Sequence, residues 1–324
     1  QKMAPVFYSN VILLLLASLN LASGGKLLVI PMDGSHWLSM KPMLKQLRQN
    51  GHEMVIVAPE VNMHIKPAED LYSLKTYPVP FTYEEMDENI QGISEQAFDD
   101  VPFLLMIANT IEHMKKTSVF FLGSCTHLLY NKELRMYFRE NKFDAILSDP
   151  FWPCGQIVAE YFDIPSVFFL RGIPCGYEFE ATQCPRPPSY VPRALTRYSD
   201  HMTFLQRVKN MLFHLTEFFL CSFVYSPYAK LASEFLQRDM TFAELISNGS
   251  VWLIREDFAF TYPKPLMPNM IMIGGINCAG KEPLSQVCKF QCCLKSLLLV
   301  SFSFNFVKEL PMQCFVVPAV SSSL

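Results

Sequence analysis

Residues 26–36 read KLLVIPMDGSH, and this stretch decides the fold class of the chain. The apolar run Lys26–Pro31 predicts a buried strand over Lys26–Ile30, and the loop Met32–Ser35 follows the run. His36 comes directly after that loop, where a helical pattern begins. In an open α/β sheet the carboxyl ends of the strands form the ligand crevice. We therefore expect His36 to be a candidate base rather than only a core residue.

The pattern after His36 predicts a helix and a second strand. The apolar residues on one side of the helix are Leu38, Met43, Leu44 and Leu47. The helix is expected to stop at Asn50-Gly51, and Met54–Ala58 is the next predicted strand. A βαβ unit with a right-handed crossover results, and it implies a parallel sheet with helices on both faces.

A second βαβ unit is predicted farther along the chain. Its parts are a strand at Ala145–Ser148, the step Asp149-Pro150, a helix over Ile157–Phe162 and a strand at Ser166–Leu170. Asp149 therefore ends a strand on the same side of the sheet as His36. Because the proline removes a backbone donor and stops the strand ladder there, Asp149 is expected to face the crevice.

His36 and Asp149 form the pair to which this pattern assigns chemistry. A neutral imidazole accepts a proton from a substrate hydroxyl, while a carboxylate on the other ring nitrogen fixes the tautomer and stabilises the imidazolium. Base catalysis of this kind supplies about 10²- to 10⁴-fold. Strand-end His and Asp residues also serve as caps and turn formers, so spacing alone leaves a purely structural role open.

Between the two units the pattern changes from loop to helix. The acidic stretch 84–88 is expected to be a loop, and a long helical region is expected at 99–140. Two apolar stretches in that region, Phe103–Ile107 and Phe120–Leu122, are candidates for lining the pocket of a greasy substrate. Ordinary core packing is the alternative, and the one that apolar helix faces favour.

The segment after the second unit is rich in turns and then helical. The proline-rich stretch Gly172–Pro192 is expected to be a long loop rather than a linker between domains. Within the helical part, Met211–Leu220 has only His214 and Glu217 as ionisable groups. That composition allows peripheral contact with a membrane surface, although a buried helix is the interpretation we favour.

The composition is that of a folded protein without an electrostatic footprint for nucleic acid. Half of the 324 residues are apolar, which is ample for one large domain or two smaller ones. The chain has 27 basic and 30 acidic residues, a net charge of −3, and the two signs are interspersed. We therefore exclude nucleic acid as a partner.

Residues 1–25 are expected to be a cleaved secretory signal peptide. Lys2 precedes the apolar block Val11–Ala17, and the small residues Ala22–Gly25 follow as a cleavage zone. The block is shorter than the roughly 18 residues that span a bilayer, and a buried N-terminal helix is the alternative. Because the chain opens with Gln1, Met3 is a candidate for the true start.

A chain in the secretory pathway can carry disulfides and N-glycans. There are ten cysteines, whose pairing the sequence does not determine, and we expect most of them to be buried small hydrophobic residues. The cluster Cys288, Cys292 and Cys293 matches no usual zinc spacing, so no metal site is expected. Asn248, in the sequon ahead of the strand-like stretch Val251–Ile254, is the expected glycosylation site.

Several of these stretches, in this order, resemble the UDP-glucuronosyltransferases, in particular the first subfamily. The matching motifs are Gly24–Trp37, Asp149-Pro150-Phe151 with Cys154, Ser199–Phe204 with Gln206-Arg207-Val208, and Met267–Met270 through Gly274–Cys278. The resemblance covers residues 3–286 and is specific, because several long motifs occur in order.

The resemblance implies a two-domain glycosyltransferase of the GT-B type with Rossmann-like domains that face each other across a cleft. Residues 26–286 are then the N-terminal domain, which binds a lipophilic acceptor, while the other domain binds the co-substrate UDP-glucuronic acid; no cofactor is implied. His36 becomes the expected base and Asp149 its orienting partner, in an inverting transfer of glucuronic acid to a hydroxyl of the acceptor. The resemblance also implies the lumenal side of the endoplasmic reticulum and the metabolism of foreign compounds.

Residues 287–324 depart from the family pattern and are expected to be an irregular tail. The donor-binding domain with its His-Gly-rich signature is expected to be missing, as are the membrane helix and the basic cytoplasmic tail. Gly274-Gly275 lacks the spacing of a phosphate-cradling loop, and no stretch of the tail is long enough for a transmembrane anchor. A real splice or read-through product and a misassembled gene model are the open accounts of this tail.

Two functions of different class fit these expectations. The first is the acceptor half of a glucuronosyltransferase, inactive without a donor domain. The second is a non-catalytic truncated form that associates with full-length relatives, as a homo- or hetero-oligomer, and changes their activity. Its motivation is the apolar surface that a missing domain leaves uncovered, because such surface marks interfaces.

Overall fold

The computed structural model describes residues 24–96, 102–193, 196, 198–259 and 261–276 of the chain. Nearly all of the expected signal peptide, the expected tail after residue 286 and five of the ten cysteines lie outside these residues. Among the helices that the structure describes, none is both long enough and apolar enough to cross a membrane.

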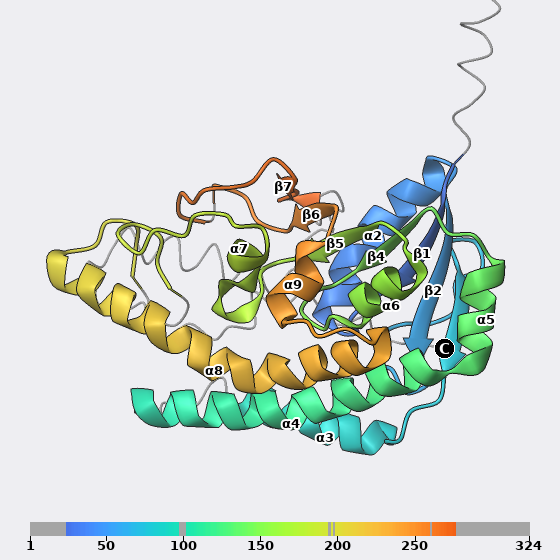
Figure 1. Ribbon diagram of the computed structural model, residues 1–324, viewed down its shortest axis with the longest axis horizontal. Helices are drawn as coiled ribbons and strands as arrows, with labels where there is room; N and C mark the ends of the chain where they lie inside the picture. The colour runs from blue at the N-terminus through green and yellow to red at the C-terminus, as the bar shows by residue number, and fades with distance from the viewer. Residues whose placement is uncertain (1–23, 97–101, 194–195, 197, 260, 277–324) are drawn as a thin grey trace, which may run out of the picture. The chain divides into compact units, whose positions relative to one another are not determined.

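Seven parallel strands form one sheet in the order β3-β2-β1-β4-β5-β6-β7 (Figure 1). They are β1 (Lys26–Ile30), β2 (Glu53–Pro59), β3 (Ser73–Tyr77), β4 (Ala145–Ser148), β5 (Ser166–Leu170), β6 (Val251–Ile254) and β7 (Met270–Met272). The order reverses between β1 and β4, because the chain moves outward to β3 on one side and outward to β7 on the other. The expected Rossmann-like α/β fold is confirmed.

Both faces of the sheet are buried. Successive side chains of a strand point to opposite faces. In β1, Leu28 and Ile30 therefore belong to one hydrophobic cluster, and Val29 belongs to another. Strands covered on both faces have near-continuous apolar runs, which is why β1 and β2 are recognisable in the sequence.

Helix α2 (Ser35–Gln49) packs on one face of the sheet (Figure 1). Its buried residues Trp37, Met40 and Leu44 recur at spacings of three and four, and they join the cluster that contains Val29. The Trp37 indole nitrogen also donates to the His64 carbonyl oxygen (3.1 Å), which joins the helix to the segment after β2.

The other face carries several helices. They are α4 (Phe103–Tyr130), α5 (Lys132–Glu140), α6 (Cys154–Phe162) and α8 (Phe204–Leu236). Helices α4 and α8 run side by side (Figure 1), and the buried Tyr228 hydroxyl of α8 donates to the Ser118 carbonyl oxygen of α4 (3.1 Å). Together these helices cover the cluster that contains Leu28 and Ile30.

Helix α3 (Tyr83–Gln96) occupies the acidic stretch that we expected to be a loop. The Thr82 hydroxyl oxygen accepts a hydrogen bond from the Glu85 amide (3.3 Å), and the Glu85 carboxylate accepts one from the Thr82 amide (2.9 Å). This capping box satisfies two amides that a helix start leaves without partners, and the helix dipole favours negative charge there. The loop expectation was wrong because these acidic residues begin a helix.

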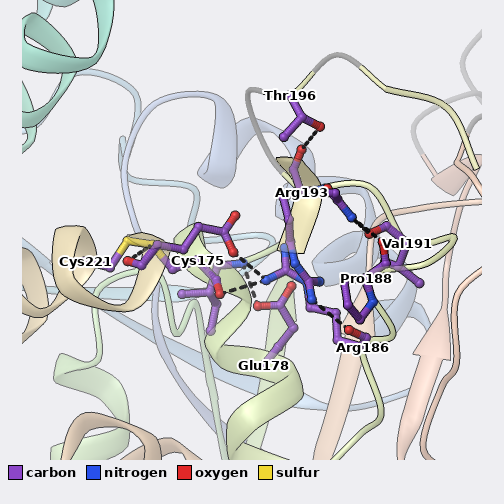
Figure 2. Close-up of polar contacts among 11 residues, drawn as sticks. Cys175, Glu178, Arg186, Pro188, Val191, Arg193, Thr196 and Cys221 are labelled. Atoms are coloured by element: carbon purple, nitrogen blue, oxygen red, sulfur yellow. Dashed lines mark hydrogen bonds and ion pairs between the residues drawn. A yellow bond between two sulfur atoms is a disulfide. The ribbon is translucent and has the colours of Figure 1, made fainter. Parts of the chain in front are cut away.

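The segment between β5 and α8 is fastened to α8 by buried contacts (Figure 2). A disulfide joins Cys175 to Cys221. The Arg186 guanidinium donates to the Glu217 carboxylate and to the Cys175 carbonyl oxygen, both at 2.9 Å. Arg193, 2% exposed, donates to the Arg186 carbonyl oxygen (2.7 Å). The segment therefore packs within the domain, as expected, although it also contains two short helices that were not predicted.

Those short helices are η1 (Pro174–Gly176) and α7 (Tyr177–Ala181), and α7 packs beside α9 (Phe242–Ser247). The α7 residue Glu178 is buried, and its carboxylate accepts a hydrogen bond from the Ile173 amide (3.2 Å). Burial raises the pKa of Glu178 to about 7, and the positive charges of Arg186 and Lys264 oppose that rise.

Four of the five described cysteines form disulfides, Cys125–Cys154 and Cys175–Cys221, and Cys184 is a buried thiol. The expectation that most cysteines are small hydrophobic residues is therefore wrong for the part of the chain that the structure describes. The bonded residues are 29 and 46 positions apart in the sequence, so only the tertiary fold brings them together.

Candidate active site

His36 and Asp149 lie at the carboxyl ends of two neighbouring strands. β1 and β4 end at Ile30 and Ser148, which pair with each other in the parallel register. The order of the sheet reverses between these two strands. Open α/β sheets bind ligands at this position, because the loops that follow the two strands separate there.

The two side chains are in direct contact. Nδ1 of His36 is 2.5 Å from Oδ2 of Asp149. Because a carboxylate only accepts hydrogen bonds, Nδ1 is the donor of this contact, and in the neutral imidazole the lone pair is then on Nε2. The imidazole is 23% exposed, whereas the carboxylate is 1% exposed. The imidazole is therefore accessible, while the carboxylate that it contacts is buried.

Asp149 is held by the turn that begins α6. Its Oδ1 accepts a hydrogen bond from the Phe151 amide (2.9 Å), so each carboxylate oxygen has a donor. The Phe151 ring packs edge-on against the His36 imidazole, with ring centroids 5.5 Å apart. The same turn thus holds the His36 imidazole through both a carboxylate and a ring.

Asp33 holds the loop that leads into α2, and His36 is in the first turn of that helix. Its carboxylate accepts hydrogen bonds from the Gly34 amide (2.6 Å), the Met63 amide (2.5 Å) and the His64 amide (3.2 Å). Gly34 has a φ of +79°, which a residue with a side chain rarely adopts, so the sharp turn into α2 depends on glycine. Asp33 therefore joins the loop after β1 to the segment after β2.

A cavity of about 380 Å³ opens beside His36. Its walls come from the loop after β1, the segment after β2, helices α3 and α4, and the start of α6. The volume lies within the range of small-molecule sites, about 300–1,000 Å³. The lining is mostly apolar and includes Phe81, Phe120, Phe121 and Trp152. The cavity is thus mostly apolar, has room for a small molecule and borders the His36 imidazole.

The apolar stretches of α4 divide between cavity and core. Phe120 and Phe121 line the cavity, as one of the two interpretations expected, and both Phe121 and Leu122 pack against the core. Leu105 is 48% exposed. The structure does not describe the side chains of the other four residues of Phe103–Ile107.

Neutral polar groups complete the described lining. The Tyr77 and Ser124 hydroxyls are 2.9 Å apart, and the Thr117 hydroxyl donates to the Asn89 side-chain oxygen (2.9 Å). Burial raises the pKa of Tyr77 to about 12, with the Ser124 contact acting in the opposite direction, so this phenol stays uncharged near neutral pH. These groups can orient a ligand without adding charge to the cavity.

A disulfide borders the same cavity. Cys125 of α4 and Cys154 of α6 both line it, and their sulfur atoms are bonded. Cys125 is four residues beyond Phe121, and Cys154 is two residues beyond Trp152. The bond therefore joins the two wall segments on which these rings are mounted.

Basic side chains follow the next two strands at the same edge of the sheet. Arg171 comes directly after β5, and Arg255 directly after β6. Burial lowers the pKa of Arg255, and the positive charge of Arg171 lowers it further, whereas the charge of Asp149 raises it. The edge of the sheet that carries His36 and Asp149 thus also carries two guanidinium groups.

The predicted glycosylation site is on the surface. Asn248 is exposed and follows α9 directly, and its side-chain nitrogen donates to Glu160 (2.8 Å). An attached glycan replaces one of the two hydrogens on that nitrogen, and the other remains for Glu160. Modification of Asn248 stays a prediction.

The structure thus brings together the two residues that the sequence assigned to chemistry, and their catalytic roles stay a prediction. Sequence reasoning missed Asp33, Trp152 and the Cys125–Cys154 disulfide. Asp33 was within the quoted loop, and Trp152 stands next to Phe151. Their contacts include residues far away in the sequence. The only sequence signal for Asp33 and Trp152 was therefore their position near His36 and Asp149 in the chain.

Comparison with known proteins gives a family match and close relatives. A family model described as UDP-glucoronosyl and UDP-glucosyl transferase matches residues 25–304, a range that extends past residue 286. The chain is 54% identical to UDP-glucuronosyltransferase 1A1 of Homo sapiens, over 81% of this chain and 49% of that protein. It is 50% identical to UDP-glucuronosyltransferase 1-2 of Rattus norvegicus, over 87% and 53% respectively. The chain spans about half the length of these curated relatives.

Two solved structures illustrate the structural similarity that was found. The glycotransferase of kitacinnamycin is 12% identical, with a TM-score of 0.43, and the match covers 81% of this chain and 53% of that one. A calicheamicin glycosyltransferase is 12% identical, also with a TM-score of 0.43, over 78% of this chain and 53% of that one.

Proposed function

Because the chain belongs to the UDP-glucoronosyl and UDP-glucosyl transferase family, we propose that it forms the acceptor side of a glucuronosyltransferase. The observation that carries the proposal is the 2.5 Å contact between His36 and Asp149 on an apolar cavity. UDP-glucuronic acid is the proposed donor, because the similar human and rat proteins are named UDP-glucuronosyltransferases. The proposed acceptor is a lipophilic small molecule with a hydroxyl group.

The proposed reaction is a single displacement. Nε2 of His36 takes the proton from the acceptor hydroxyl, and the oxygen attacks the anomeric carbon of the sugar. The bond from that carbon to the diphosphate breaks, and its electron pair leaves with UDP, so the configuration inverts. The buried Asp149 carboxylate stabilises the imidazolium that forms, and it keeps Nε2 as the accepting nitrogen.

A chimera tests this proposal. Residues 26–276 replace the matching half of the human relative, and glucuronide formation from a phenol and UDP-glucuronic acid is measured by mass spectrometry. We expect a β-glucuronide from the α-linked donor. A chimera that has the native disulfides but forms no glucuronide contradicts the proposal. The 324-residue chain alone is proposed to be inactive, and turnover by that chain contradicts this part.

An oxidising compartment fits the described disulfides. The structure has two such bonds, Cys125–Cys154 and Cys175–Cys221, and disulfides in general persist in oxidising compartments such as the lumen of the endoplasmic reticulum and are rare in the cytosol. We therefore propose that the chain resides on the lumenal side. Protection of the chain from protease in sealed microsomes, and its loss when detergent is added, is the result expected.

A second candidate function rests on exposed apolar side chains of α8. They are Phe204, Leu205, Met211, Leu212, Leu215 and Phe223, with exposed fractions of 46% to 70%. Exposed apolar patches mark interfaces with proteins or membranes. The chain is then a non-catalytic partner that binds full-length relatives, or contacts the membrane surface, through this helix. The chain is co-expressed with the human relative, and association is measured by pull-down and activity by turnover. If the two proteins do not associate and the activity does not change, the proposed binding to full-length relatives is contradicted.

A further inference from the structure

A second cavity lies beside the segment that the Cys175–Cys221 disulfide fastens to α8. It has a volume of about 540 Å³, and its walls come from η1, α7, the segment after α7 and helix α8. None of its described lining residues also lines the cavity beside His36. The proposed transfer does not use this second cavity, so it is available to a separate ligand.

The Arg186 guanidinium is held in the wall of this cavity (Figure 2). Its Nη1 donates to the Glu217 carboxylate and to the Cys175 carbonyl oxygen, both at 2.9 Å. Its central carbon lies 5.3 Å from the centroid of the Phe179 ring. Gly176 leaves room for the group, because a Cβ at that position would be 2.4 Å from Nη1. A guanidinium that is already ordered loses little conformational entropy when a ligand binds.

One edge of the same guanidinium is unused. Among the described residues, neither Nε nor Nη2 of Arg186 has a hydrogen-bond partner. Guanidinium N–H groups form a fixed fork that matches the two oxygens of a carboxylate. The Nε–Nη2 edge is such a fork, and Arg186 lines the cavity. A carboxylate bound there can accept two parallel hydrogen bonds.

A second guanidinium adds positive charge behind Arg186. Arg193 is 2% exposed, and its Nη2 donates to the Arg186 carbonyl oxygen (2.7 Å). Its Nε and Nη1 have no hydrogen-bond partner in the part of the chain that the structure describes. Burial lowers the pKa of His214, which lines the cavity, and the positive charges of Arg193 and Arg186 lower it further. Both guanidiniums therefore act on a group in the cavity wall, and a buried charge such as that of Arg193 is costly unless it is paired.

The charges around the two guanidiniums favour a ligand with a single negative charge. Of the two lining carboxylates, Glu217 pairs with Arg186, and Glu180 is exposed. One ligand carboxylate balances the charge of Arg193, whereas a second negative charge would be repelled by Glu180 and Glu217. Burial raises the pKa of the neighbouring Glu178 to about 7, so this group is mostly protonated at pH 6.

We propose that this second cavity binds a small monocarboxylate with an apolar body, and that the carboxylate occupies the Nε–Nη2 edge of Arg186. The apolar body has a matching surface, because the lining also includes Tyr177, Phe179 and Leu215. The inference goes beyond the proposed function and does not depend on it, because it concerns binding at a site apart from His36.

Calorimetric titration of the purified 324-residue chain at pH 6 tests the proposal with three probes. They are 3-phenylpropanoate, its neutral counterpart 3-phenylpropanamide, and inorganic sulfate, which carries two negative charges. We expect the propanoate to bind at least about tenfold more tightly than the amide, because its hydrogen bonds to Arg186 are charge-assisted and bidentate. Sulfate is expected to bind at least about tenfold more weakly than the propanoate, because it lacks the apolar body and carries a second charge.

Two substitutions of Arg186 separate the fork from the charge. Arg186→Met removes both, and it is expected to weaken propanoate binding at least about tenfold and to leave the amide within about twofold. Arg186→Lys keeps the charge without the planar fork, and a loss of at least about threefold is expected. Arg139→Met changes an exposed arginine of α5 outside the cavity, and as the control it is expected to change neither affinity.

Each outcome supports or overturns the proposal. Failure of the propanoate to bind, equal binding of propanoate and amide, tighter binding of sulfate, or an unchanged propanoate affinity in both Arg186 variants overturns it. If Arg186→Met does not fold, judged by near-ultraviolet circular dichroism, the wild-type preferences and Arg186→Lys decide it. If Phe120→Ala weakens propanoate binding and the Arg186 variants do not, the probe occupies the cavity beside His36 and the proposal is wrong. A chimera that forms no glucuronide leaves these titrations unaffected, so the two proposals fail separately.

Discussion

Removing the Cys125–Cys154 disulfide is expected to destabilise the domain strongly. The bond closes a loop of 29 residues, and in the chain-entropy description its loss costs about 3.6 kcal/mol at 25 °C. Replacing both cysteines with alanine, Cys125→Ala/Cys154→Ala, removes the bond and leaves small apolar residues in a buried environment. The assay is urea unfolding of the purified chain, followed by circular dichroism.

The buried thiol Cys184 provides the matched control. Cys184→Ala removes one sulfur atom from the core without breaking a bond, so a loss of about 1 kcal/mol is expected. If the double variant loses no more stability than this control, the disulfide does not constrain the chain and the reasoning is refuted.

Three further predictions concern single side chains. Burial raises the pKa of Glu178 from 4.5 to about 7, so the folded chain binds this proton more tightly than the unfolded chain does. The free energy of unfolding therefore falls as the pH rises between those two values, by up to about 3 kcal/mol. Glu178→Gln is expected to reduce the difference between the urea midpoints at pH 5 and pH 8, and an unchanged difference contradicts the assignment. Asn248→Gln is expected to abolish the mass shift caused by glycosidase treatment of the chain expressed in secretory cells, and a persisting shift places the glycan elsewhere. Asp33→Ala is expected to lower the free energy of unfolding by about 2–4 kcal/mol, because three backbone hydrogen bonds are lost. A loss of less than about 1 kcal/mol in urea unfolding shows that the two loops are stable without these bonds.

The central strands and the reactive pair could be predicted because their signals are local. β1 and β4 are apolar runs that end at loops, and parallel pairing then places His36 and Asp149 at one edge of the sheet. The apolar run of each of these strands stops where the strand ends. The expected bounds of β1, β4 and β5 therefore agree with the structure.

Other elements could not be predicted because their stability comes from elsewhere. β3 (Ser73–Tyr77) is an edge strand with mostly exposed side chains, so it lacks the apolar run that marks a central strand. α3 depends on the Thr82–Glu85 capping box, which acidic composition concealed. The stack of Phe121 on Trp152 joins residues far apart in the sequence, and no local pattern encodes such a contact.

The central claim is that His36, oriented by Asp149, is the base of the transfer. The most direct test is the turnover rate of the chimera after His36→Gln, measured beside His201→Gln, which changes a histidine whose side chain is 94% exposed. The account predicts that glucuronide formation falls about 10²- to 10⁴-fold in the first variant and stays within about twofold in the second. A His36→Gln chimera that retains the native disulfides and turns over at a rate near that of the unchanged chimera contradicts it.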